Sequence, residues 1–237
     1  MSTLRYFVGL DIAAETFMAA IGTTPWKLLV KAKQFANAPD GFQQFDSWLR
    51  EQNCPLEQTV VCMEATGVYG EALAYYLVAH QYAVAIEPPL KVKRAFKPHG
   101  PKTDAVDSEQ IAEYACRYSD ELMLWQPPSE LVEHLQVLLS TREQLVQQST
   151  AHQNALRALR RKVVRITFAE QVYEQMITET KSRAKALEQE IQRLIDQHPT
   201  AHRLLTWLVT IPGVGLLLAT HVLVLTQCGT RPFPSPK

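Results

Sequence analysis

Tyr6-Phe7-Val8-Gly9-Leu10-Asp11-Ile12-Ala13 is an apolar run that contains a single acid. Such a run is typical of a buried strand, and this one delivers Asp11 to a polar break. A second short apolar run, from Thr59 to Glu64, again ends in an acid. If the two strands are central neighbours in one sheet, Asp11 and Glu64 come together at its edge.

Lys102-Thr103-Asp104-Ala105-Val106-Asp107 opens an apolar helical run and places two aspartates three residues apart. This spacing puts both carboxylates on the same face of one helical turn. One interpretation is that Thr103 or Asp104 caps the helix and that the acids complement its dipole. The other is that the pair converges with Asp11 and Glu64. The residues alone leave both open.

The order of the elements around these acids predicts an α/β domain with a mixed sheet. Strands are expected at 6–13, 17–22, 28–35, 59–64 and 83–87. Helices are expected from Phe42 to about Asn53, from Glu71 to His80, and after Thr103. The first three strands form a meander, and helices separate the later ones.

From Leu131 onward the pattern becomes purely helical. Apolar residues recur at alternating steps of three and four, which predicts a long helix with a heptad-like seam. A second helix, carrying Tyr173, Met176, Leu187, Ile191 and Leu194, is expected to return alongside it as a hairpin. Because polar residues interrupt the seam, it is either a buried face within the chain or a coiled coil between two chains. The seam consists of Leu135, Leu138, Arg142, Leu145, Ser149, His152, Leu156, Leu159, Val163 and Ile166.

A further short helix, Leu204 to Thr210, precedes Ile211-Pro212-Gly213-Val214-Gly215 and an apolar helix from Leu216 to Leu225. This pattern is similar to the hairpin of a helix-hairpin-helix unit, in which Gly213 and Gly215 would let backbone N–H groups approach a phosphate. An ordinary turn between two helices has the same pattern.

The charge of the 237-residue chain is balanced, with 24 basic and 24 acidic residues. A zero net charge gives no global electrostatic argument for a nucleic-acid partner. The cations are nevertheless gathered in two acid-free segments, whose alternative interpretation is a solvated helix face. The segments contain Lys91, Lys93, Arg94, Lys97 and Lys102, and Arg157, Arg160, Arg161, Lys162 and Arg165.

The four cysteines, Cys54, Cys62, Cys116 and Cys228, are far apart in the sequence. They have none of the spacings of a zinc site or a redox pair, which predicts free thiols in a reducing cytoplasm. The first residues lack the pattern of a signal peptide, and no apolar run is long enough to span a membrane.

Four acids from three separate elements indicate a particular chemistry. Clustered carboxylates repel one another unless a cation neutralises them. Hard oxygen ligands favour Mg²⁺ or Mn²⁺ over zinc. Two such ions about 4 Å apart activate a water or a 3′-hydroxyl and stabilise the leaving oxygen in phosphodiester chemistry.

Three segments carry a family resemblance: Val8-Gly9-Leu10-Asp11, Met63-Glu64-Ala65-Thr66-Gly67-Val68-Tyr69 and Lys102 to Asp107. In this order they resemble the acidic motifs of the IS110/IS1111 insertion-sequence transposases. Later segments, Arg142 to Leu145, Asn154 to Arg157 and Ile211 to Gly215, are similar to that family's linker helix and the opening of its C-terminal domain.

The resemblance implies a fold and a set of domains. Residues 1–125 would form a RuvC-like, RNase H-type domain in which Asp11, Glu64, Asp104 and Asp107 are the catalytic tetrad that binds Mg²⁺ or Mn²⁺. Residues 126–198 would form a helical or coiled-coil hairpin, and residues 199–237 the start of a C-terminal transposase domain. It also implies DNA and an element-encoded guide RNA as partners, a homo-oligomer (dimer or tetramer), and a bacterial cytoplasmic, nucleoid-associated location without a membrane. The implied nucleic-acid contacts are Lys91, Lys93, Arg94, Lys97, Lys102, Arg157, Arg160, Arg161, Lys162, Gly213 and Gly215.

One departure from the family bears on activity. Its members continue past a segment matched here by Phe233 to Lys237 into a region that carries a nucleophilic serine. We therefore expect no recombination by this polypeptide alone. Two other functions fit the same acids or cations: a RuvC-like structure-specific nuclease, and a non-catalytic nucleic-acid-binding remnant.

Overall fold

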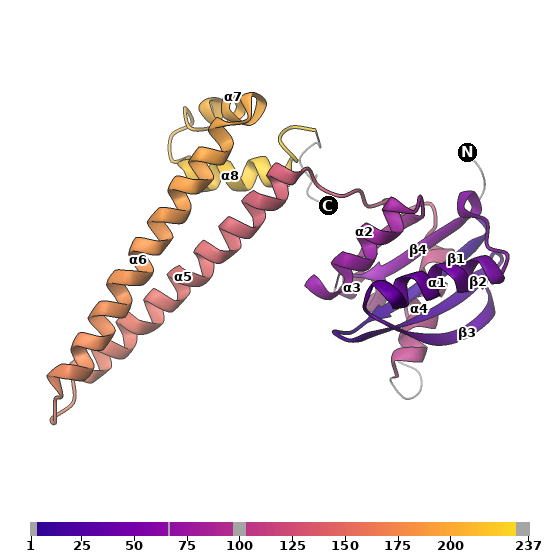
Figure 1. The fold of residues 1–237 in the computed structure, drawn as a ribbon, viewed down its shortest axis with the longest axis horizontal. Coiled ribbons are helices and arrows are strands. Elements are labelled where there is room, and N and C mark those ends of the chain that lie inside the picture. Colours follow the sequence, from indigo (N-terminus) through magenta and orange to yellow (C-terminus); the bar gives the residue numbers. More distant parts are fainter. Residues whose placement is uncertain (1–3, 66, 97–102, 231–237) are drawn as a thin grey trace. The chain divides into compact units, whose positions relative to one another are not determined.

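The computed structural model describes residues 4–65, 67–96 and 103–230, and these divide between Pro127 and Pro128 into two compact units. The first unit is built on a five-stranded sheet with the order β3-β2-β1-β4-β5 (Figure 1). Its strands are β1 (Tyr6–Ile12), β2 (Thr16–Thr23), β3 (Lys27–Ala36), β4 (Thr59–Glu64) and β5 (Ala83–Glu87).

The sheet is mixed, as the order of elements predicts. Strand β1 pairs antiparallel with β2, and β2 antiparallel with β3, whereas β1 and β4, and β4 and β5, are parallel. Short turns suffice for the antiparallel meander, while each parallel pair needs a crossover connection. The crossovers carry α1 (Pro39–Glu51) and α2 (Glu71–Ala79), together with the short 3-10 turns η1 (Leu56–Gln58) and η2 (Val68–Gly70). This meander followed by parallel strands is the RNase H-like arrangement.

The two faces of the sheet have separate apolar cores. Successive residues of a strand point to opposite faces. On β1, Val8 and Leu10 pack with residues of α1 and α2 such as Phe45 and Leu73. Phe7 points the other way, into a core shared with α3 (Pro89–Ala95) and α4 (Asp104–Arg117).

Helix α4 lies against the backbone of β1 at Gly9. A Cβ atom on Gly9 would lie 2.1 Å from the carbonyl oxygen of Ser108 and 2.3 Å from the backbone nitrogen of Ala112. Only a residue without a side chain allows this approach. The contact fixes which part of α4 lies over which part of β1.

The second unit is helical. Helices α5 (Glu130–Arg160) and α6 (Thr167–Asp196) run side by side as a hairpin, and α7 (Pro199–Leu208) and α8 (Leu216–Leu225) lie at one end of it (Figure 1). One apolar core joins all four helices, and it includes Leu135, Ile195, Leu205 and Leu223. Helix α7 begins five residues before the predicted start, because Pro199 at its first position is compatible with a helix start.

The heptad-like seam packs within the chain. Leu135, Ser149 and Leu156 on α5 are buried, and α5 contacts α6 along the hairpin. The predicted continuation of the seam to Ile166 is wrong: α5 ends at Arg160, and the side chains of Val163 and Ile166 are exposed. Residues 161–166 instead make the turn between the helices, so their apolar side chains have no facing helix.

Cys54, Cys62, Cys116 and Cys228 are free thiols. In the part of the chain that the structure describes, no helix combines the length and the apolar character needed to cross a membrane.

Candidate active site at the carboxyl edge of the sheet

Asp11 and Glu64 occupy equivalent places on neighbouring parallel strands. Leu10 of β1 is in register with Met63 of β4, and each acid is the next residue along its strand. Neighbouring strands lie about 4.8 Å apart. Alternation along the strand puts both acids on the face that packs against α4, since Leu10 and Met63 belong to the opposite core.

Asp104 and Asp107 lie in the first turn of α4. Thr103 caps this helix, because its Oγ1 accepts a hydrogen bond of 3.3 Å from the backbone N–H of Val106. Asp107 directly precedes Ser108, whose carbonyl oxygen lies against Gly9, two residues before Asp11. The acidic turn of α4 therefore lies over the carboxyl end of β1.

The four acids share this edge but differ in exposure. Asp104 is exposed, whereas Asp11, Glu64 and Asp107 are half-buried. Among residues 4–65, 67–96 and 103–230, no three His, Cys, Asp or Glu side chains lie close enough together to hold a metal ion. The structure thus pairs Asp11 with Glu64 on the sheet and sets the α4 acids above them, without a closed ligand cluster.

Glu87 is an acid of this edge that sequence reasoning missed. It ends β5 and is in register with Glu64 of β4, so both side chains point to the α4 face. Its side chain is buried and pairs with Lys91 and with the hydroxyl of Tyr114. A usable signal existed in the sequence, because the run from Ala83 to Glu87 also ends in an acid.

The pKa of the Cys62 thiol is affected by both glutamates, Glu64 and Glu87. Cys62 lies two residues before Glu64 on β4, on the same face of the sheet, and is fully buried. Burial raises the pKa of the Cys62 thiol, and the negative charges of Glu87 and Glu64 raise this pKa further. Cys62 therefore stays protonated, and it is a packing residue and no nucleophile.

A comparison with protein families identifies the chain. The model of the IS110-type DEDD transposases matches residues 8–165, which is most of the chain and includes all four predicted acids. The chain belongs to this transposase family.

The relatives of this IS110-type chain include the pilin gene-inverting proteins of Moraxella bovis and Moraxella lacunata. Each is 29% identical over 240 residues, covering 98% of this chain and 69% of the relative. Among solved structures, RuvC of Thermus thermophilus in complex with a Holliday junction substrate is similar over 51% of this chain and 99% of its own. The identity is 11% and the TM-score 0.39. As a member of a DNA transposase family, the chain is an enzyme that acts on DNA.

The first group of predicted cations on this transposase divides into engaged and exposed residues. Lys91 is held by Glu87, with 3.1 Å between Nζ and Oε2. Lys93 and Arg94 on α3 are exposed. Lys97 and Lys102 lie outside the described residues. Among the described cations of this group, Lys93 and Arg94 are therefore the ones with exposed side chains.

The second group lies at the end of α5. Arg157, Arg160, Arg161 and Lys162 are all exposed. Arg160 also pairs with Glu170 and Glu174 of α6, and so braces the turn of the hairpin. Gly213 has a positive φ of 86°, and Gly215 is the N-cap of α8. The two glycines thus shape the turn between α7 and α8.

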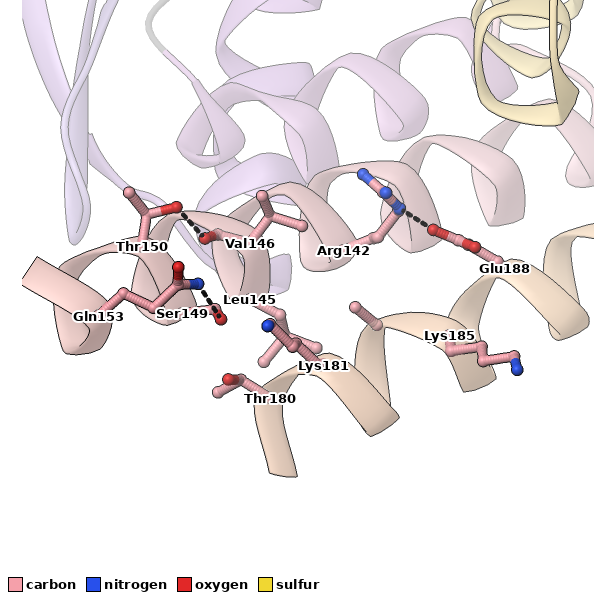
Figure 2. Close-up of a pocket in the computed structure, with 11 residues that line it drawn as sticks. Arg142, Leu145, Val146, Ser149, Thr150, Gln153, Thr180, Lys181, Lys185 and Glu188 are labelled. Atoms are coloured by element: carbon pink, nitrogen blue, oxygen red, sulfur yellow. Dashed lines mark hydrogen bonds and ion pairs between the residues drawn. The ribbon is translucent and has the colours of Figure 1, made fainter. Parts of the chain in front are cut away.

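The middle of the α5–α6 hairpin contains a cavity of about 380 Å³ that is lined by both polar and apolar side chains. Figure 2 shows Arg142 of α5 reaching across to Glu188 of α6, and the distance between Nε and Oε1 is 2.7 Å. Ser149 lies about two helical turns after Arg142 on α5 and is buried. Lys181 and Lys185 of α6 also line the cavity. These contacts explain why the seam is interrupted by polar residues.

Proposed function

We propose that this chain supplies the metal-dependent acid site of a transposase that cleaves and transfers DNA strands. The catalytic and metal-binding residues would be Asp11, Glu64, Asp104 and Asp107. The observation that carries the proposal is the register of β1 with β4, which sets Asp11 beside Glu64 under the acidic first turn of α4.

The donor set fits Mg²⁺ or Mn²⁺ by its chemistry. All four side chains offer hard carboxylate oxygens, which these ions prefer over nitrogen or sulfur. Asp11 and Glu64 would hold an ion from the sheet, and Asp104 and Asp107 would hold it from α4. When bound, such ions activate the attacking oxygen and stabilise the leaving oxygen of a phosphodiester. The chain's own contribution is to fix the carboxylates on two strands and one helix.

The proposed partners are DNA and a guide RNA encoded by the same element. Support for phosphate binding comes from exposed cations on α3 and at the end of α5, since lysine and arginine contacts to phosphates position nucleic acids. The guide RNA, the homo-oligomer and the association with the bacterial nucleoid rest on the family resemblance. The glycine turn between α7 and α8 is a further candidate phosphate contact.

The test is a strand-cleavage assay with the 237-residue chain, a supercoiled plasmid and a four-way DNA junction. Nicking that requires Mg²⁺ is expected, and it should vanish in Asp11→Asn, Glu64→Gln and Asp104→Asn. Binding measured by gel mobility shift should persist in these variants. Glu51→Gln, at the exposed end of α1 on the opposite face, is the matched control and should cleave like wild type.

The same assay separates the alternative functions. Cleavage confined to the junction would favour a RuvC-like structure-specific nuclease. Binding without any Mg²⁺-dependent cleavage would favour a non-catalytic remnant. Strand exchange by this polypeptide unaided would refute the expectation that it does not recombine DNA alone.

A further inference from the structure

Glu87 stands beside the proposed site as a fifth carboxylate. The parallel pairing of β4 with β5 sets it in register with Glu64, one strand away. Only 4% of Glu87 is exposed to solvent, so water screens its charge poorly. A buried carboxylate at this place would repel Glu64 and compete for any divalent ion bound there.

Two side chains, those of Lys91 and Tyr114, contact the carboxylate of Glu87. The ammonium of Lys91 lies 3.1 Å from its Oε2 atom, and the Tyr114 hydroxyl donates a hydrogen bond of 3.4 Å to the same oxygen. Lys91 also lies 5.8 Å from the centre of the Tyr114 ring and 3.9 Å from Oε2 of Glu121. The hydrogen bond with Tyr114 and the charge of Glu87 raise the pKa of Lys91, so the cation is permanent at physiological pH.

These contacts join three elements at the carboxyl edge. Glu87 ends β5, Lys91 belongs to α3 and Tyr114 belongs to α4, the helix whose first turn carries Asp104 and Asp107. Tyr114 is itself almost completely buried, at 1% exposure. The neutralised pair is thus a fixed part of the packing between α4 and the sheet.

We propose that Lys91 is an internal counter-cation that withholds Glu87 from divalent-ion binding, so that Glu64 alone serves as the glutamate ligand. This inference rests on the proposed function for the identity of the neighbouring site. Lys91 is then a positioning residue for the metal ligands, in place of the phosphate contact expected from the sequence.

The test uses Mn²⁺ binding to the full chain, followed by the electron paramagnetic resonance signal of the free ion. Lys91→Met keeps the length of the side chain and removes its charge. Because Glu87 then faces the site uncompensated, we expect Lys91→Met to bind Mn²⁺ about tenfold more tightly than wild type. Adding Glu87→Gln to it should return the affinity to within about threefold of Glu87→Gln alone.

Two results would overturn the proposal. One is an unchanged affinity in Lys91→Met. The other is the same gain when Glu87 is already glutamine, which would mark a general effect of removing a cation. Thermal melts by circular dichroism show whether each variant folds. If Lys91→Met does not fold, Glu87→Gln decides: an affinity within about threefold of wild type supports the proposal, and a loss as large as that in Glu64→Gln overturns it.

Asp11→Asn separates this proposal from the proposed function. If wild type binds no Mn²⁺, or if its binding survives Asp11→Asn, the acid site is refuted. The proposed role of Lys91 is then still tested by whether Lys91→Met gains a Mn²⁺ site that the further substitution Glu87→Gln removes. Such a gain supports the role of Lys91, and no gain overturns it.

Discussion

The backbone of Gly9 touches the backbone of Ser108. A Cβ atom at Gly9 would come within 2.1 Å of the Ser108 carbonyl oxygen, so no larger residue fits while α4 keeps its place on β1. Since Asp11 follows Gly9 by two residues and Asp107 precedes Ser108 by one, this contact sets the spacing between the sheet acids and the helix acids.

Gly9→Ala should therefore separate α4 from β1. Overpacking of this kind costs about 1–3 kcal/mol, and here both clashing atoms belong to backbone. We expect a loss of that size in urea unfolding followed by circular dichroism, together with a loss of Mg²⁺-dependent cleavage. For stability alone, Gly215→Ala is the matched control, because a Cβ there meets nothing within 4 Å. Equal stability of Gly9→Ala and Gly215→Ala would contradict the close contact between Gly9 and Ser108.

The Tyr82–Asp46 hydrogen bond should make stability fall at alkaline pH. Burial and this 2.5 Å hydrogen bond raise the pKa of the Tyr82 hydroxyl above its usual value. The unfolded chain loses the Tyr82 proton from about pH 10 upward, while the folded chain keeps it. The stabilisation is thus complete below about pH 10 and is lost as pH rises toward the folded pKa.

Tyr82→Phe tests this relationship. It should cost about 1–3 kcal/mol at pH 8, because the Asp46 carboxylate loses a buried donor. The difference from wild type should shrink between about pH 10 and pH 11 in urea titrations. A difference that stays constant with pH would rule out the proposed titration.

Glu170 should stabilise the turn of the hairpin at neutral pH but not in acid. It accepts hydrogen bonds from Arg165, at 2.8 and 2.6 Å, and from Arg160, at 3.3 Å. The hydrogen bonds from Arg165, followed by those from Arg160, lower the pKa of Glu170. The stabilisation is present above the unfolded pKa of about 4.3 and disappears as pH falls through the folded pKa.

Glu170→Gln should accordingly lower the melting temperature at pH 7 and match wild type near pH 2. Hydrogen exchange of the amides in residues 161–170 locates the effect. Glu179→Gln removes the pair that Glu179 makes with Arg183, in which both side chains are exposed, so little change is expected from this control. A pH-independent effect of Glu170→Gln would indicate packing and not charge.

Lys93 and Arg94 should contribute to DNA binding through phosphates alone. Each substitution to alanine is expected to weaken binding to all sequences alike and to reduce the slope of log K against log salt by about 1. Fluorescence anisotropy between low and moderate salt measures the slope. Lys27→Ala, at the exposed start of β3, supplies the control, and an equal effect there would show that α3 is not a specific contact surface.

Much of the sheet could be predicted from the sequence because its signals are local. The apolar runs that end in Asp11, Glu64 and Glu87 predict three strands without knowledge of their neighbours. The lateral order is a nonlocal property, and so the role of Glu87 was missed: its significance depends on pairing with Glu64, 23 residues earlier in the chain.

In the helical unit, the sequence pattern extends beyond the end of the helix that it predicts. Heptad spacing predicts the seam correctly as far as Leu156, but it continues through Val163 and Ile166, where the chain in fact turns. Periodicity describes one helix face and cannot indicate where the opposing helix ends. The position of the turn is set by pairing between separate segments, such as Arg160 with Glu170.

The ion pair between Arg142 and Glu188 links one position of α5 to one position of α6. Displacing α6 by one turn along α5 would move Glu188 about 5.4 Å and break its ion pair with Arg142. A polar match of this kind within a helix–helix seam favours one alignment of the two helices over shifted ones. The alignment of α5 with α6 therefore depends on this polar contact as well as on apolar packing.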